Sequence, residues 1–132
     1  MLKKYNTLND LFIDQINKEG YIRFINSKSE EEELSFSEFG TNIKKCLGLF
    51  QSLGFKSDDE IVINTKSNIK FLECFWAAIL GGMIPVPIAV GVGEEHRKKL
   101  FEVLLQLKNP KLITDDNVFS RLISFLKTKD QY

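Results

Sequence analysis

The stretch that decides the fold is Ile61–Ile88, with the sequence IVINTKSNIKFLECFWAAILGGMIPVPI. Its first three residues form a short, continuous apolar run, which is typical of a strand buried on both faces. Apolar residues at helical spacing follow from Ile69 to Leu80. After a turn at Gly81-Gly82, the segment Ile84–Ile88 predicts a second short strand. A strand, a helix and a strand of these lengths predict a βαβ crossover and therefore two parallel strands.

The same alternation continues toward the C-terminus. Glu94 and Glu95 begin a second helix, and Pro110 ends it. Leu112–Thr114 then predicts a third short strand. Asp115 or Asp116 caps a last helix from Phe119 to Leu126.

Two prolines restrict the length or the position of the second strand. Pro85 and Pro87 lack amide donors, so this strand is expected to be short or to lie at an edge of the sheet. Because strand geometry has a period of two, both missing donors face the same side, and the other side keeps its hydrogen bonds.

Upstream of this unit we expect an N-terminal helix and a β-hairpin, followed by a strongly capped helix. Ser35 and Glu38 have capping-box spacing, and Leu34 and Phe39 occupy the two positions of a hydrophobic staple. The remaining predicted features are a helix from Leu8 to Ile16 capped by Thr7, a strand at Tyr21–Ile25, an exposed turn carrying Glu30–Glu33, a return strand at Leu34, and a helix end at Gly54. The predicted fold class is α/β, as a single unit over residues 1–132: a largely parallel sheet with helices on its faces.

Composition excludes several classes of function. The 18 basic and 18 acidic residues give a net charge of zero, so no basic surface for nucleic acid is expected. The 20 uncharged residues from Cys74 to Gly93 contain two glycines and two prolines in their interior, which argues against a membrane span. The N-terminus develops no apolar signal segment, which favours the cytoplasm.

The reactive residue types are better explained by structure than by chemistry. Cys46 and Cys74 lie in apolar helical patterns and are expected to be inert, and His96 is expected to lie on a polar surface, so no metal site is predicted. Trp76 is expected in the core, and Ser35 needs no role beyond capping. Gly91 and Gly93 precede two glutamates that repel an anion, which favours a simple turn.

Four segments in this order resemble the opening part of the adenylate-forming enzymes, the superfamily of acyl-CoA synthetases, fatty acyl-AMP ligases and nonribosomal peptide synthetase adenylation domains. Phe36 and Phe39 replace the usual Tyr and Leu, and Asp58 stands where the family usually has Gly. The segments are LSFSEF at Leu34–Phe39, LGF and DDEIVI between Leu53 and Ile63, FWAAILGGMIPVP at Phe75–Pro87, and NPKLITD at Asn109–Asp115.

The resemblance implies an incomplete N-terminal portion of an AMP-binding domain. The intact enzyme would use ATP and Mg²⁺ to activate a fatty, aryl or amino acid as an acyl-AMP, and would pass the acyl group to CoA or a carrier protein. The Pro-Val-Pro form and the polar run Glu94–Lys99 look most like ligase modules of polyketide and peptide synthetase assembly lines. The family's phosphate loop, ribose-binding Asp and C-terminal Lys have no counterpart here, so we assign no catalytic, cofactor-binding or metal-binding residue and expect no activity from this chain alone.

Partners follow from the same interpretation. The chain is expected to pack against the remainder of the adenylation domain, and when isolated to self-associate through exposed apolar surface. The alternative is a stand-alone, non-catalytic α/β binding or signalling module of receiver-like or flavodoxin-like topology. For that alternative, Thr65–Asn68 is a faint candidate for a phosphate loop, and Asp115-Asp116 is the acidic pair that follows a strand.

Overall fold

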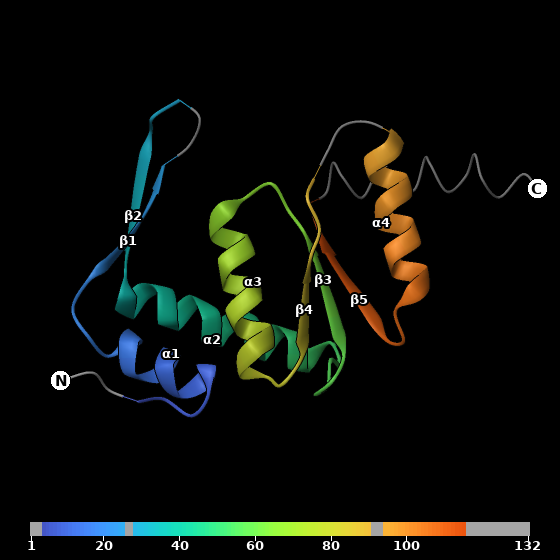
Figure 1. Ribbon diagram of the computed structural model, residues 1–132. Helices are drawn as coiled ribbons and strands as arrows, with labels where there is room; N and C mark the ends of the chain where they lie inside the picture. The colour runs from blue at the N-terminus through green and yellow to red at the C-terminus, as the bar shows by residue number, and fades with distance from the viewer. Residues whose placement is uncertain (1–3, 26–27, 91–93, 116–132) are drawn as a thin grey trace, which may run out of the picture.

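The computed structural model describes residues 4–25, 28–90 and 94–115. Within these residues lies a three-stranded parallel sheet in the order β4-β3-β5 (Figure 1). Helices α3 and α4 lie on opposite sides of it (Figure 1). The βαβ prediction is therefore confirmed. The elements are β3 (Glu60–Asn64), α3 (Asn68–Leu80), β4 (Ile84–Pro87), α4 (Glu94–Gln106) and β5 (Pro110–Thr114).

Strand β3 is buried on both faces, as its continuous apolar run predicts. Ile61, Val62 and Ile63 are all 0% exposed. Because side chains alternate along a strand, Ile61 and Ile63 face the core formed with α2 and α3, whereas Val62 faces Leu100 of α4. One strand thus supports two apolar layers, and this fixes β3 in the middle of the described sheet.

Strand β4 lies at an edge of the described sheet, which confirms the interpretation of its prolines. The amides on either side of the prolines keep their partners: Ile84 N–H donates to Asp59 O at 2.8 Å, and Ile88 N–H donates to Ile63 O at 3.0 Å. Pro85 and Pro87 alternate with these donors, so their missing amides face away from β3.

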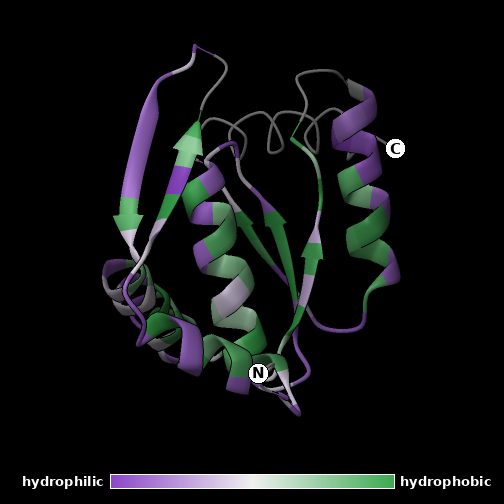
Figure 2. Ribbon diagram, turned by 60° about the vertical axis from the view of Figure 1, so that its left-hand side comes forward, coloured by the Kyte–Doolittle hydropathy of each residue, from purple (hydrophilic) through white to green (hydrophobic). Residues whose placement is uncertain are grey.

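The N-terminal part adds α1 (Leu8–Ile16), the antiparallel hairpin β1 (Tyr21–Ile25) with β2 (Glu31–Ser35), and α2 (Phe36–Ser52). Both predicted N-caps are present, since Thr7 Oγ1 accepts from Asp10 N–H and Ser35 Oγ accepts from Glu38 N–H. The hairpin extends away from the parallel sheet (Figure 1), and β2 is largely hydrophilic (Figure 2).

Two sequence predictions are corrected here. Glu31–Glu33 lie in strand β2 and not in a turn, because Arg23 on β1 binds Glu33 Oε1 at 2.6 Å and Glu31 at 3.6 Å across the ladder. Helix α4 ends at Gln106, before Pro110, and Pro110 begins β5. A proline is allowed as the first residue of a strand, where its lost donor is least costly.

The connection into β3 packs against the glycine turn after α3. Asp58, at the position where the family pattern has glycine, has a left-handed φ of +72°, which aspartate tolerates better than most residues. Its amide donates to Gly82 O at 2.9 Å, and Gly82 itself has a φ of +73°. The departure from the family pattern therefore preserves the backbone shape that glycine would supply.

None of the helices in the described part of the chain is long and apolar enough to cross a membrane. The uncharged run from Cys74 instead divides into the end of α3, the glycine turn and β4, as predicted. The predicted last helix, and the turn at Gly91 and Gly93, lie outside the described residues.

Candidate functional site

The carboxyl end of the parallel sheet is where a ligand site is expected in this architecture. The connection from β3 leads to α3 on one face, and the connection from β4 leads toward α4 on the other face (Figure 1). Neighbouring strands whose connections diverge in this way create a switch point, and open α/β sheets bind ligands there. Asn64, the last residue of β3, occupies this point.

The Asn64 side chain closes the gap between β3 and the end of β4. It is only 3% exposed. Its Nδ2 donates to Ile88 O at 3.2 Å and to Ala89 O at 3.4 Å, and its Oδ1 accepts from Thr114 Oγ1 at 3.5 Å. One amide therefore connects the ends of three strands.

A carboxylate closes the adjoining gap, between β3 and β5. Asp115 follows β5, and its two oxygens accept from Thr65 Oγ1 at 2.7 Å and from Lys66 N–H at 2.8 Å. The Thr65 hydroxyl in turn accepts from Ser67 N–H, and Ser67 caps α3 by accepting from Lys70 N–H. We call Asn64, Thr65, Lys66 and Asp115 the carboxyl-end latch.

This arrangement decides the role of Thr65–Asn68, the faint phosphate-loop candidate. The Lys66 amide, which would face a phosphate, already holds the Asp115 carboxylate. An incoming anion would have to displace a charge-assisted hydrogen bond and would meet a negative charge. Among the described residues there is also no group of three or more His, Cys, Asp or Glu side chains able to hold a metal ion. The latch is therefore suited to holding strand ends together, not to binding an anion.

The Asp115 carboxyl has a lowered pKa. Burial alone would raise it, but the Lys66 amide and the Thr65 hydroxyl, together with the charges of Lys70 and Lys66, favour the ionised form and outweigh burial. A group with a lowered folded pKa stabilises the fold above the pKa of the unfolded chain, and this contribution is lost as the pH falls through the folded pKa.

We predict that Asp115→Asn lowers the unfolding free energy by about 1 kcal/mol at neutral pH, since the partly exposed carboxylate loses two charge-assisted hydrogen bonds. Chemical denaturation of both proteins at neutral pH and at about pH 3 measures the difference. It should shrink at the lower pH, because Asp115 is then becoming protonated in the native protein. A difference of equal size at both pH values would show that the charge is irrelevant.

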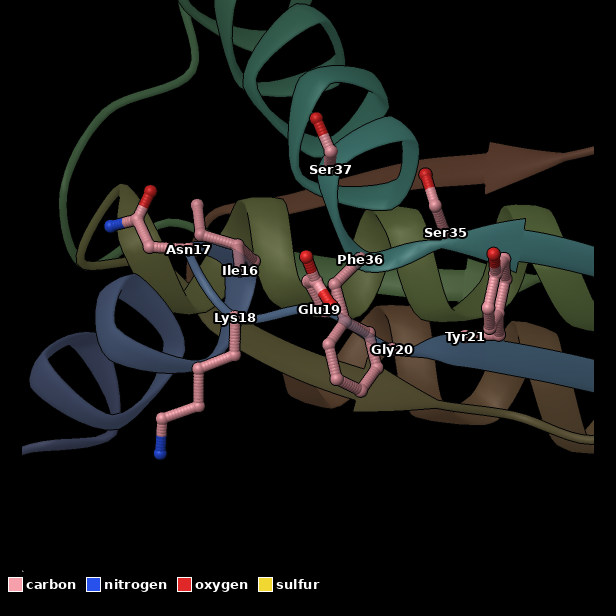
Figure 3. A pocket seen from close by; sticks show the side chains of 9 residues that line it. All are labelled: Ile16, Asn17, Lys18, Glu19, Gly20, Tyr21, Ser35, Phe36 and Ser37. Atoms are coloured by element: carbon pink, nitrogen blue, oxygen red, sulfur yellow. The ribbon is translucent and has the colours of Figure 1, made fainter.

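Two hollows in the surface include latch residues in their lining: Thr65 and Asp115 in one, and Lys66 in the other. A third, of about 600 Å³, lies away from the latch, between the α1–β1 connection and the start of α2 (Figure 3). Figure 3 shows the Phe36 ring beside Gly20, with the Lys18 ammonium directed away. Its lining combines backbone, two serine hydroxyls and isolated charges, and so provides no pair of groups for acid–base chemistry.

The residues singled out from the sequence for their reactive or aromatic side chains occupy structural positions. His96 is exposed on α4, and Trp76 stacks on Phe12 with ring centroids 5.2 Å apart. Ser35 acts as a helix cap. The meeting of the two cysteines was not predicted from the sequence: Cys46 on α2 and Cys74 on α3 have their sulfur atoms 3.9 Å apart. Their 28-residue separation gives no hint of this, but both occupy the core-facing sides of helices that pack together.

The fold is similar to those of several solved structures. No protein-family model matches the sequence. The adenylation domain of a keto acid-selecting NRPS module bound to keto acyl adenylate aligns with a TM-score of 0.82 and 22% identity, covering 98% of this chain and 25% of that chain. The McyG A-PCP structure complexed with phenylalanyl-adenylate aligns with a TM-score of 0.82 and 23% identity, covering 98% of this chain and 24% of that chain. The fatty acid AMP ligase from Legionella pneumophila aligns with a TM-score of 0.77 and 19% identity, covering 92% of this chain and 22% of that chain.

The chain has the fold of the N-terminal part of an adenylate-forming ligase. It spans about a quarter of the length of these solved structures. The matching part is the scaffold itself: the hairpin, the capped helix and the parallel sheet. The predicted fold class is thereby confirmed, including its assignment to the N-terminal subdomain of the adenylate-forming enzyme fold.

Proposed function

We propose that this chain is the N-terminal scaffold of an adenylate-forming ligase that converts a carboxylic acid and ATP to an acyl-AMP and transfers the acyl group to a thiol. The observation that carries the proposal is the likeness over 98% of the chain to an adenylation domain. The four motifs between Leu34 and Asp115 support it, because they follow the family order and coincide with the capped helix, the glycine turn and the β-strands.

We further propose that the chain has no ligase activity on its own. Adenylation needs donors arranged around the phosphates and a cation at the reacting centre. The sequence has no phosphate-binding motif, and the loop after β3 is closed by Asp115. The ATP and Mg²⁺ sites would therefore belong to the remainder of the domain.

The carrier-protein thiol of an assembly line is our proposed acceptor, and the reducing cytoplasm our proposed compartment. Two of the similar structures are an NRPS module's adenylation domain and an A-PCP structure, and this supports the carrier-protein thiol as the acceptor. The exposed side chains of Leu105 on α4 and Ile25 on β1, 72% and 59% exposed, are our proposed contacts with the rest of the ligase and the source of self-association when the chain is isolated.

Pyrophosphate release tests the proposal in two parts. The chain mixed with ATP, Mg²⁺ and a panel of carboxylic acids should release none, and release well above the background would overturn the scaffold assignment. In a chimera, the chain replaces the corresponding opening quarter of the keto acid-selecting adenylation domain. A chimera with one cooperative thermal transition should form acyl adenylate; a folded but inactive chimera would count against the proposal.

A further inference from the structure

The strongest unexplained feature is the cysteine pair between two packed helices. Cys46 Sγ and Cys74 Sγ lie 3.9 Å apart, close to van der Waals contact. Both thiols are free, Cys74 is 7% exposed, and Cys46 is half-buried. They are the two cysteines of the whole sequence. The sulfur atoms would have to approach by about 2 Å to reach the length of an S–S bond.

A surface groove gives small molecules access to this pair. The groove has a volume of about 460 Å³, and both cysteines line it. Its lining also includes the charged side chains of Lys45, Lys70 and Glu73. The exposed Leu49 and Leu53 line it as well. A peroxide molecule, which is little larger than a water molecule, is far smaller than this groove.

The two thiols are unequal. The hydrogen bond between the two sulfur atoms lowers the pKa of Cys46 and raises the pKa of Cys74, and burial raises the pKa of both thiols. The half-buried Cys46 sulfur is also the more accessible of the two, since Cys74 is only 7% exposed. Since the thiolate is the nucleophile, Cys46 is placed to attack and Cys74 to resolve.

We propose that Cys46 and Cys74 form a reversible disulfide that joins α2 to α3, with hydrogen peroxide as the oxidant. The Cys46 thiolate attacks one peroxide oxygen, the O–O bond breaks, and the departing hydroxide takes a proton to become water. The Cys74 sulfur then attacks the Cys46 sulfenic acid, the S–S bond forms, and the hydroxyl leaves with the second thiol proton as water. Two thiols are oxidised by two electrons, and one peroxide is reduced to two waters.

The disulfide would close a loop that contains β3 and three of the four latch residues, Asn64, Thr65 and Lys66. Cross-linking residues 28 positions apart restricts the unfolded chain, so the oxidised protein should melt at a higher temperature, by about 10 °C. The same bond would hold α2 against α3. Disulfides in reducing compartments are typically transient, which fits a reversible site and not a permanent structural bond.

Intact-mass analysis after peroxide treatment tests the inference. The wild-type chain should become about 2 Da lighter, yield a Cys46–Cys74 cross-linked peptide, and regain its mass with dithiothreitol. Cys74→Ser should instead accumulate a sulfenic acid at Cys46 that a dimedone probe captures, and Cys46→Ser should react far more slowly. Addition of oxygen to Cys46 in the wild type without a cross-link, or an unchanged mass, would overturn the proposal.

The folded arrangement is tested by repeating the oxidation in concentrated urea. The cross-link should form several-fold more slowly there, because the sulfur atoms are no longer held together. Equal rates in buffer and in urea would show that the helix packing contributes nothing, which also overturns the proposal. These mass measurements do not depend on ligase activity, so they stand or fall separately from the proposed function.

Discussion

The Asn64→Asp variant is expected to lose about 3 to 5 kcal/mol of unfolding free energy at neutral pH, although it differs from the wild type by one NH₂ group. Asn64 Nδ2 donates to two carbonyl oxygens, those of Ile88 and Ala89, from a side chain that is 3% exposed. An aspartate places a buried negative charge against the same two acceptors. Neither carbonyl can donate, so the oxygen that replaces Nδ2 faces two acceptors, and the Thr114 hydroxyl, 3.5 Å from the other oxygen, offsets little of the charge.

The pH dependence of this loss identifies its cause. Burial beside acceptors raises the folded pKa of the introduced carboxyl above its unfolded value. The penalty is therefore full above the folded pKa and decreases as the pH falls below it, because the protonated acid is neutral and donates one hydrogen bond. Urea denaturation of the variant and the wild type, at neutral and mildly acidic pH, measures both effects.

Asn68→Asp is the matched control. It makes the same chemical change four residues away, at an exposed position in the first turn of α3. A negative charge near the N-terminus of a helix is favourable, so the unfolding free energy of this variant should rise by about 0.3 kcal/mol. If both variants lost the same stability, the latch around Asn64 would not be the source of the effect.

How far the sequence alone predicts this fold depends on whether the signals are local. The Ser35 cap, the Gly54 helix end and the buried run at Ile61–Ile63 were all predictable, because each depends on neighbouring residues and on one backbone geometry. The edge position of β4 was predictable for a similar reason, since Pro85 and Pro87 exclude a central strand.

Features that depend on tertiary contacts were not predictable in this way. Glu31–Glu33 have the composition of a solvated turn, but they form a strand that pairs with Arg23–Ile25 of β1, and Arg23 also forms ion pairs with Glu31 and Glu33. Likewise, Asp115 offers no sign in the sequence that its carboxylate will hold the Lys66 amide, 49 residues earlier. Helical periodicity places each cysteine on an apolar face but does not determine which faces meet.

The Gly82→Ala variant should lose about 2 to 3 kcal/mol, from two separate causes. The first is the backbone, because Gly82 has a φ of +73°, where a β-carbon costs about 1 to 2 kcal/mol. The second is contact: a β-carbon at this position would lie 2.8 Å from Ser57 Oγ. That hydroxyl donates to Gly82 O at 3.3 Å, so it must rotate away and lose this bond.

A control and a double variant separate these causes. Gly48→Ala, inside α2, has open space around the added methyl group and should gain about 0.5 to 1 kcal/mol from helix propensity. Combining Gly82→Ala with Ser57→Ala removes the contact but leaves the backbone strain, so the pair should cost less than the sum of the single variants. Thermal and urea denaturation of the wild type, the three single variants and the double variant give these differences. Strict additivity would assign the entire loss to the left-handed backbone, and a Gly82→Ala protein as stable as the wild type would contradict the turn geometry itself.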